Sequence, residues 1–186
     1  MTRIPYPDES ELDDDAREVL ASLPPLNVMR MFAGAPAPLR PMAELGRSIL
    51  LEAELDPRLR ELAILAVARA SGSHYEQVQH ENVSRALGMP DEEIATVVEG
   101  RADELDEEAQ LVVAFAEEVA RDVAASEELT AAVVELLGRR QATELVICCA
   151  YYSAVARVIE TCGVELEEES PTAGLTAEDA QRYRGG

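Results

Sequence analysis

The chain has 186 residues and a mass of 20.2 kDa, which is the size of one domain or of two small ones. Acidic residues outnumber basic residues 37 to 16, so the formal net charge is -21 and the isoelectric point is about 4.3. A chain this acidic repels phosphate backbones and anionic lipid headgroups, so we expect no nucleic-acid partner and no membrane partner. All 16 basic residues are arginines, which excludes Schiff-base chemistry on a lysine.

Apolar residues recur at helical rather than alternating spacing along most of the chain, which predicts an all-α fold. Two consecutive prolines, Pro24 and Pro25, end the first predicted helix. A connector rich in proline and methionine follows over residues 26–41 and contains one short helix. The predicted helices, in chain order, span residues 9–23, 28–32, 42–51, 57–70, 73–88, a short segment opened by Pro90, 106–123, 126–137 and 141–162.

The predicted helix over residues 57–70 is expected to be central. Asp56 is a suitable N-cap, and Pro57 is a suitable first helical residue. Because apolar residues lie on nearly every face of this helix, we expect it to be buried. The pattern as a whole predicts a single helical domain over residues 1–165, followed by an acidic, flexible tail over residues 166–186.

The first 15 residues lack the basic and apolar regions of a signal peptide. The longest apolar stretches, Leu62–Ala68 and Leu145–Ala156, are shorter than the ~20 residues that a membrane span needs. On a shared helix Cys149 and Cys162 would lie roughly 20 Å apart, too far for a disulfide, and the neighbours Cys148 and Cys149 are also poor partners. We therefore expect three reduced thiols and a cytoplasmic protein.

The chain has only two histidines, and His80 shares a predicted helix face with two other polar residues. At 100° per residue, Ser73, Glu76 and His80 fall within about 60° of one another. Glu61 begins the apolar run of the preceding helix, where an unpaired carboxylate is costly. If the turn between the helices folds them together, Glu61 faces this stripe. Two carboxylates and an imidazole in a dry site are suited to acid/base catalysis.

The stripe also has a purely structural interpretation. Ser73 and Glu76 fit the S-x-x-E capping box, in which the two side chains satisfy backbone amides at the start of a helix. Glu76 and His80 are four residues apart, which is also the spacing of an ordinary pair on a helix surface. A single histidine on a helix is more often structural than catalytic, so the spacing by itself predicts only a candidate site.

Glu61 likewise has an alternative role as a buried anchor for an arginine such as Arg69 or Arg157. A metal ion held by Glu61, Glu76 and His80 is a further alternative, but one histidine with two glutamates is a weak set of ligands, so we expect no metal. The chain contains no glycine-rich phosphate loop and no G-x-S-x-G, H-E-x-x-H or C-x-x-C motif. We therefore expect no cofactor.

The same residues lie within four short stretches: R-E-L-A-I-L at 60–65, S-H-Y-E-Q-V-Q-H at 73–80, A-L-G at 86–88 and D-E-E-I at 91–94. In combination these stretches resemble the carboxymuconolactone decarboxylase family, which also includes alkylhydroperoxidases of the D type. The resemblance extends from the N-terminus to about Glu165. It implies an oligomeric helical bundle of the alkylhydroperoxidase D type.

The peroxidase branch of that family uses a glutamate, a C-x-x-C pair and a histidine, in the spacing of Glu61, Ser73, Glu76 and His80. Ser73 and Glu76 stand at the two cysteine positions, so both thiols are missing. Reduction of a peroxide by thiols needs a thiolate nucleophile and a resolving thiol, which these two side chains cannot supply. Thiol peroxidase activity is therefore not expected.

For the decarboxylase branch, the resemblance implies that a carboxylated muconolactone loses CO₂ and that the carbon left behind is protonated. His80 would donate the proton, and Glu61 would set the tautomer and the pKa of His80. These two residues are the expected catalytic residues. Ser73, Tyr75 and Glu76 are expected to bind the substrate.

We therefore expect an enzyme that carries out proton-transfer chemistry on a small organic acid or lactone. Members of the family form helical oligomers, so the resemblance also implies a homo-oligomer, as a dimer, trimer or hexamer, joined through apolar faces. Two alternatives remain open. One is a divergent alkylhydroperoxidase-type antioxidant protein, and the other is a non-catalytic member of the family that binds a small molecule.

Overall fold

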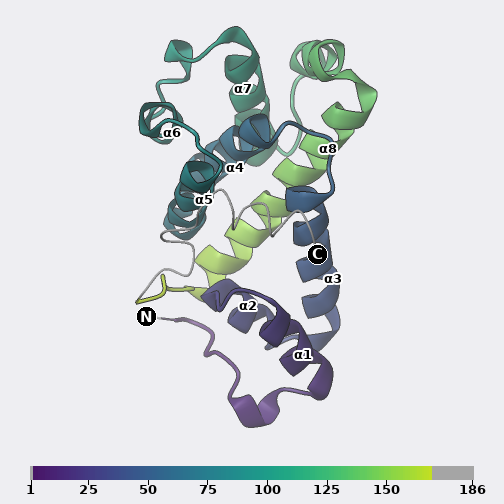
Figure 1. Cartoon of the computed structure of the whole chain (residues 1–186), viewed down its shortest axis with the longest axis vertical. Helices are drawn as coiled ribbons and strands as arrows, with labels where there is room; N and C mark the ends of the chain where they lie inside the picture. The colour runs from purple at the N-terminus through teal and green to yellow at the C-terminus, as the bar shows by residue number, and fades with distance from the viewer. Residues whose placement is uncertain (1, 169–186) are drawn as a thin grey trace.

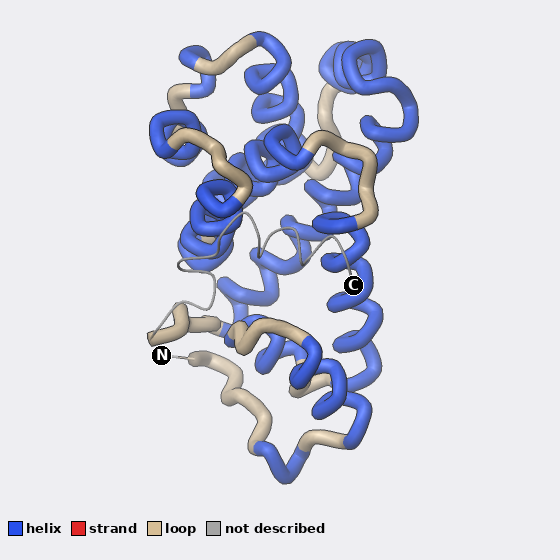
Figure 2. The backbone as a smooth tube through the Cα atoms, viewed as in Figure 1, coloured by secondary structure: helices blue, strands red, loops and turns tan. Residues whose placement is uncertain are grey.

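The structure is a computed structural model that describes residues 2–168, and this part of the chain consists of helices joined by loops and contains no strand (Figures 1 and 2). The prediction of an all-α fold is confirmed. Of the predicted tail, only residues 166–168 lie within the described part. The helices are η1 (Glu9–Glu11), α1 (Asp14–Ser22), α2 (Asn27–Phe32), α3 (Pro36–Leu51), α4 (Pro57–Ser71), α5 (His74–Ala86), α6 (Asp91–Val98), η2 (Ala102–Glu104), α7 (Glu107–Asp122) and α8 (Glu127–Cys162).

Helix α4 is the central element, and the residues at both of its ends explain where it begins and stops. The Asp56 side chain accepts hydrogen bonds from the first backbone amides of the helix, and Pro57 is its first residue. Gly72 ends it in the left-handed conformation, with φ of 68°. Residues 59–68 are all buried, because α5, α6, α7 and α8 pack around them (Figure 1). The prediction of a buried central helix is confirmed.

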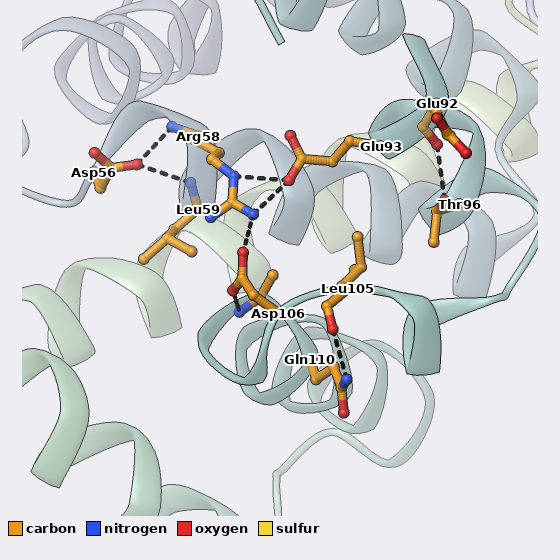
Figure 3. A network of polar contacts seen from close by, with 10 residues as sticks. Asp56, Arg58, Leu59, Glu92, Glu93, Thr96, Leu105, Asp106 and Gln110 are labelled. Atoms are coloured by element: carbon orange, nitrogen blue, oxygen red, sulfur yellow. Dashed lines mark hydrogen bonds and ion pairs between the residues drawn. The ribbon is translucent and has the colours of Figure 1, made fainter. Parts of the chain in front are cut away.

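Three charged side chains join the start of α4 to α6 and α7 (Figure 3). Arg58 donates to Glu93 from Nε at 2.7 Å and to Asp106 from Nη2 at 2.5 Å. Asp106 is also the N-cap of α7, where it accepts a hydrogen bond from the amide of Ala109. One guanidinium therefore holds the first turns of three helices together. We call Arg58, Glu93 and Asp106 the outer charge cluster.

Two helices near the N-terminus begin at other residues than predicted. Helix α1 begins later, because Asp13 is its N-cap, and the preceding residues form the turn η1. Helix α3 begins earlier, at Pro36 instead of Met42. Pro36 and Pro38 lie in its first turn, where backbone N–H groups have no acceptor within the helix. A proline-rich segment that predicts a connector is therefore compatible with the start of a helix.

Helix α8 is interrupted at Gly138, whose φ of 73° and ψ of 164° are not helical. Its two halves correspond to the separate helices predicted over residues 126–137 and 141–162. By length and composition, α8 is the one helix in the described part of the chain that could cross a membrane, but half of its most apolar window is buried inside the protein. Since a core helix meets the same criteria, this is weak evidence for a membrane span.

Candidate active site

The structure brings Glu61 on α4 and His80 on α5 together in the core. Glu61 Oε2 lies 2.7 Å from His80 Nδ1, and the two residues are 0% and 6% exposed. They meet because the Gly72 turn folds α5 back along α4. The sequence predicted this contact only on the condition that the turn brings the two helices together. A carboxylate and an imidazole are therefore paired in an environment that excludes water.

Arg60 is a third member of this site that the sequence analysis did not identify. Its Nε donates to Glu61 Oε1 at 3.0 Å, its Nη1 donates to the carbonyl of Leu50 at 2.9 Å, and the side chain is buried. Glu61 does anchor a buried arginine, but not either of the two named as examples, because Arg69 pairs with a glutamate on α7 and Arg157 donates to a backbone carbonyl of its own helix. Adjacent helical residues do not normally face each other, so no spacing rule could have paired Arg60 with Glu61.

The partners of Glu61 and His80 set their protonation. Burial by itself would raise the pKa of Glu61, but His80 and then Arg60 outweigh it, and the pKa is lowered. Burial would lower the pKa of His80, but Glu61 and then Glu76 outweigh it, and the pKa is raised. Glu61 is thus held as a carboxylate, so the proton between them belongs to Nδ1 of His80. This leaves Nε2 as the nitrogen that can exchange a proton with another group.

Glu76 faces that second nitrogen. Its Oε2 lies 3.6 Å from His80 Nε2, which is within ion-pair range but too long for a hydrogen bond. Burial raises the pKa of Glu76. The attraction of His80 opposes this rise and the repulsion of Glu61 adds to it, and the resulting pKa of Glu76 is about 7. Glu76 can therefore both hold and release a proton near neutral pH. We call Glu61, His80 and Glu76 the inner acid/base row.

The predicted capping box of Ser73 and Glu76 is wrong. Ser73 occupies the N-cap position of α5 but makes no side-chain capping bond, and its buried Oγ has no hydrogen-bond partner among residues 2–168. The backbone amide of Ser73 already donates to the carbonyl of Ala68 at 2.9 Å, so it offers nothing for Glu76 to accept. Glu76 turns to His80 instead. Ser73 is thus a buried hydroxyl on the same helix face as the inner acid/base row.

Tyr75, an expected substrate-binding residue, lies next to the inner acid/base row on α5 but points elsewhere. Its hydroxyl donates to the Glu167 carboxylate at 2.7 Å. It also accepts a hydrogen bond from the amide of Val28 at 3.4 Å. Burial, followed by Glu167, raises the pKa of Tyr75, so this hydroxyl stays protonated.

Helix α8 contributes two side chains that the sequence analysis did not assign to the site. The ring of Tyr152 packs edge-on against the imidazole of His80, with 4.7 Å between the ring centroids. Cys148 is fully buried, and burial, Cys149 and Glu61 raise the pKa of its thiol. The two residues are one helical turn apart on the apolar face of α8, but that pattern is also typical of any core helix. Only the packing of α8 on α4 and α5 reveals their place.

A pocket of about 210 Å³ reaches this region from the side of α3 and α8. Leu45, Ile49 and Ile147 are among its apolar lining residues, and Arg60 and Cys148 also line it. His80, Glu76 and Ser73 are not among the described residues that line the pocket. The pocket therefore reaches the Arg60 side of the site but not Nε2 of His80.

The charged residues of the site do not form a metal centre. His80 lies between the two carboxylates, with one nitrogen toward Glu61 and the other toward Glu76, so the three side chains do not converge on one point. Within residues 2–168 no group of three or more histidine, cysteine, aspartate or glutamate residues is arranged to hold a metal ion. The arrangement is suited to passing protons along a row.

Residues 36–127 match the model of the carboxymuconolactone decarboxylase family. The matched segment includes every member of the inner acid/base row. A comparison with curated proteins found no match.

The fold is similar to two solved structures of peroxidase-related proteins. One, described as an alkylhydroperoxidase AhpD core, is from Ralstonia eutropha JMP134; it has a TM-score of 0.76 and 19% identity over 94% of this chain and 97% of its own. The other is from Silicibacter sp. TM1040 and has a TM-score of 0.78 and 18% identity over 92% of this chain and 95% of its own. At these identities the likeness shows a shared fold and leaves the reaction open. The chain thus has the alkylhydroperoxidase D-like fold, and its residues 36–127 match the carboxymuconolactone decarboxylase family.

Proposed function

We propose that the protein catalyses proton transfer on a small organic acid or lactone, as a carboxymuconolactone decarboxylase-like enzyme. The observation that carries this proposal is the inner acid/base row, in which a buried histidine has a fixed carboxylate on one nitrogen and a carboxyl group with a pKa of about 7 near the other. Two titratable groups whose surroundings shift their pKa values in a water-excluded site are typical of acid/base catalysts.

Each member of the row has a distinct role in this proposal. Glu61 keeps the proton on Nδ1 of His80 and stabilises the imidazolium form, and Arg60 keeps Glu61 ionised. His80 Nε2 exchanges the proton with the substrate. Glu76 then restores the protonation state of His80, for which a pKa near 7 is suited. Glu61 and Arg60 are positioning residues, and His80 is the catalytic residue.

A decarboxylation through this site balances without a cofactor. The bond between the substrate carbon and its carboxyl group breaks, CO₂ leaves, and the electron pair stays on the carbon as an enolate or its equivalent. The imidazolium form of His80 gives its Nε2 proton to that carbon, and neutral His80 recovers a proton from Glu76 or water. Acid/base catalysis of this kind contributes about 10²- to 10⁴-fold to a rate.

The peroxidase alternative has less support. Ser73 and Glu76 supply no thiol, and the two adjacent cysteines of α8 are buried, with the pKa of Cys148 raised and that of Cys149 raised to about 12 by burial. A thiol held protonated is a poor nucleophile toward a peroxide. The serine and glutamate at the thiol positions therefore favour proton transfer over peroxide reduction.

We also propose that the protein is a cytoplasmic homo-oligomer. Leu45 on α3 and Val146 and Ile147 on α8 are large apolar side chains that remain exposed in the single chain. A second copy that covers them would remove apolar surface from water, which offsets part of the repulsion between two strongly acidic chains. Sedimentation equilibrium at 0.15 M salt tests this proposal, and a monomer at every concentration would refute it.

The first test of the reaction is the loss of 4-carboxymuconolactone absorbance with purified protein, with the His80→Gln variant as the control. Turnover that the substitution reduces at least about 100-fold supports the proposed role of His80. Equal turnover in the two proteins would refute that role.

A broader assay follows the exchange of carbon-bound hydrogen for deuterium in a panel of small organic acids and lactones by NMR. Exchange without decarboxylation would keep the proton-transfer chemistry and change the substrate. If the protein binds members of the panel but exchanges none of them, the non-catalytic alternative replaces the proposal.

A further inference from the structure

One carboxylate of the chain is held by three hydrogen-bond donors beside the inner acid/base row. Glu167 Oε1 accepts from the hydroxyl of Tyr75 at 2.7 Å and from the backbone amide of Asn27 at 2.5 Å. Glu167 Oε2 accepts from Nε2 of Gln79 at 2.7 Å. Both oxygens are thus bound, by donors from two helices that lie far apart in the sequence. We call Asn27 N–H, Tyr75 and Gln79 the carboxylate cradle.

The cradle belongs to the helix that carries the proposed acid/base chemistry. Tyr75 and Gln79 are one helical turn apart on α5, and each directly precedes a member of the inner acid/base row, Glu76 or His80. The face of α5 that carries Tyr75 and Gln79 is therefore rotated by about 100° around the helix axis from the face that carries Glu76 and His80. Tyr75 and Gln79 are only 4% and 5% exposed, so the cradle is an interior polar site.

The burial of Tyr75 and Gln79 favours a bound carboxylate. A hydroxyl and an amide taken out of water need hydrogen-bond partners, and donors to a carboxylate form stronger bonds than donors to neutral groups. The carboxylate comes from the segment that follows α8, where Val164 is buried and the carbonyl of Glu165 accepts from the Asn27 side chain at 3.0 Å. Glu167 itself is partly exposed, so solvent reaches the group that fills the cradle.

We propose that the cradle is a carboxylate-binding subsite that the chain fills with its own Glu167, and that a small organic acid competes with Glu167 for it. The assignment of that acid as the substrate rests on the proposed function, whereas the binding of a carboxylate by the cradle does not. When a small organic acid displaces Glu167, its carboxylate binds to Tyr75 and Gln79. These two residues of α5 directly precede Glu76 and His80. The segment over residues 164–168 then acts as a competitor for the substrate.

The test uses the full-length Glu167→Ala variant, in which the cradle loses its internal carboxylate. Propionate, which reproduces the end of a glutamate side chain, is titrated by calorimetry, with chloride replacing it at equal ionic strength. We expect the variant to bind propionate at least about tenfold more tightly than the unchanged protein does. We also expect propionate to recover the melting temperature that the substitution lowers.

Glu168→Ala is the matched control, because Glu168 carries the same charge one residue along and is exposed. Its binding of propionate should equal that of the unchanged protein. Adding Tyr75→Phe to Glu167→Ala should weaken the gained binding, since a donor of the cradle is removed. If Glu167→Ala does not fold, Glu167→Gln replaces it. The N–H group of the new amide faces the N–H donor of Gln79 and repels it, so this variant should also let propionate into the cradle.

Equal binding of propionate by the Glu167 variant, the Glu168 control and the unchanged protein would overturn the proposal. Tighter binding that survives Tyr75→Phe would overturn it as well, because the anion would then lie elsewhere. Propionate binding by the cradle together with no turnover in any assay would refute the proposed function alone. Turnover that depends on His80, without a gain in binding on removal of Glu167, would refute the cradle alone.

Discussion

Two groups of three charged residues lie along helix α4, and their surroundings differ. In the outer charge cluster, the side chains of Arg58 and Asp106 are 34% and 54% exposed. In the inner acid/base row, the Glu61 side chain is fully buried. The Glu93 side chain is more buried, at 14% exposed, but water screens Arg58 and Asp106, so the ion pairs of this group contribute little to stability. Burial of the second group costs several kcal/mol for each ion unless its partners are present.

This difference indicates what each group is for. The outer charge cluster joins the ends of three helices, a task that many other surface residues could perform. The inner acid/base row places two carboxylates and one imidazole in an apolar core, where leucines of similar size would pack without an electrostatic cost. Costly polar groups in a core are typical of functional sites. The comparison can be tested by removing one charge from each group in turn.

The largest effect is expected from Glu61→Gln. The substitution removes the charge between Arg60 and His80, and loss of one partner of a buried pair lowers the free energy of unfolding by about 3 kcal/mol or more. The pKa of His80 should also fall, because Glu61 is the main group that raises it. Urea unfolding measures the first effect, and an NMR titration of His80 measures the second. A loss of stability below about 1 kcal/mol would remove the distinction between the two groups.

A smaller, pH-dependent effect is expected from Glu76→Gln. The pKa of Glu76 is raised from 4.5 to about 7 in the folded protein, so between these values the folded state binds more protons than the unfolded state. The contribution of Glu76 to stability is therefore present at low pH and is lost as the pH rises through this window. The free energy of unfolding falls by up to about 3 kcal/mol over this range. The amide that replaces the carboxyl group does not titrate, so the variant should lack this loss.

Melting temperatures of the Glu76→Gln variant and of the unchanged protein, measured from pH 4.5 to pH 8, test this expectation. The difference between the two proteins should grow in favour of the variant as the pH rises. A constant difference across the range would mean that Glu76 has no raised pKa, and its role in restoring the proton of His80 would fail with it.

The smallest effect is expected from Glu93→Gln in the outer charge cluster. The amide oxygen can still accept from Arg58, and Arg58 keeps its second partner, Asp106. We expect a loss of less than about 1 kcal/mol in the free energy of unfolding, which should shrink further at 1 M salt. Catalytic activity should not change. A loss as large as that of Glu61→Gln would show that the outer charge cluster is as costly to break as the inner acid/base row.

Much of the fold followed from local rules that a sequence displays. Helical spacing of apolar residues predicted the all-α fold, and the apolar residues on nearly every face of α4 predicted its central place. The N-cap Asp56 and the C-terminal Gly72 act within one helical turn, so their effects can be predicted without tertiary structure. The spacing of Ser73, Glu76 and His80 likewise placed them on one face of α5.

The sequence by itself thus determined the helices, the central helix and the stripe of polar residues on α5, because each depends on neighbours within a few residues. The tertiary structure decided which partners those residues take. Arg60 reaches Glu61 against the usual spacing, Tyr152 packs on His80 from α8, and Glu167 fills the cradle from beyond α8. The last two contacts join segments that are far apart along the chain, and only the packing of helices around α4 sets their distances.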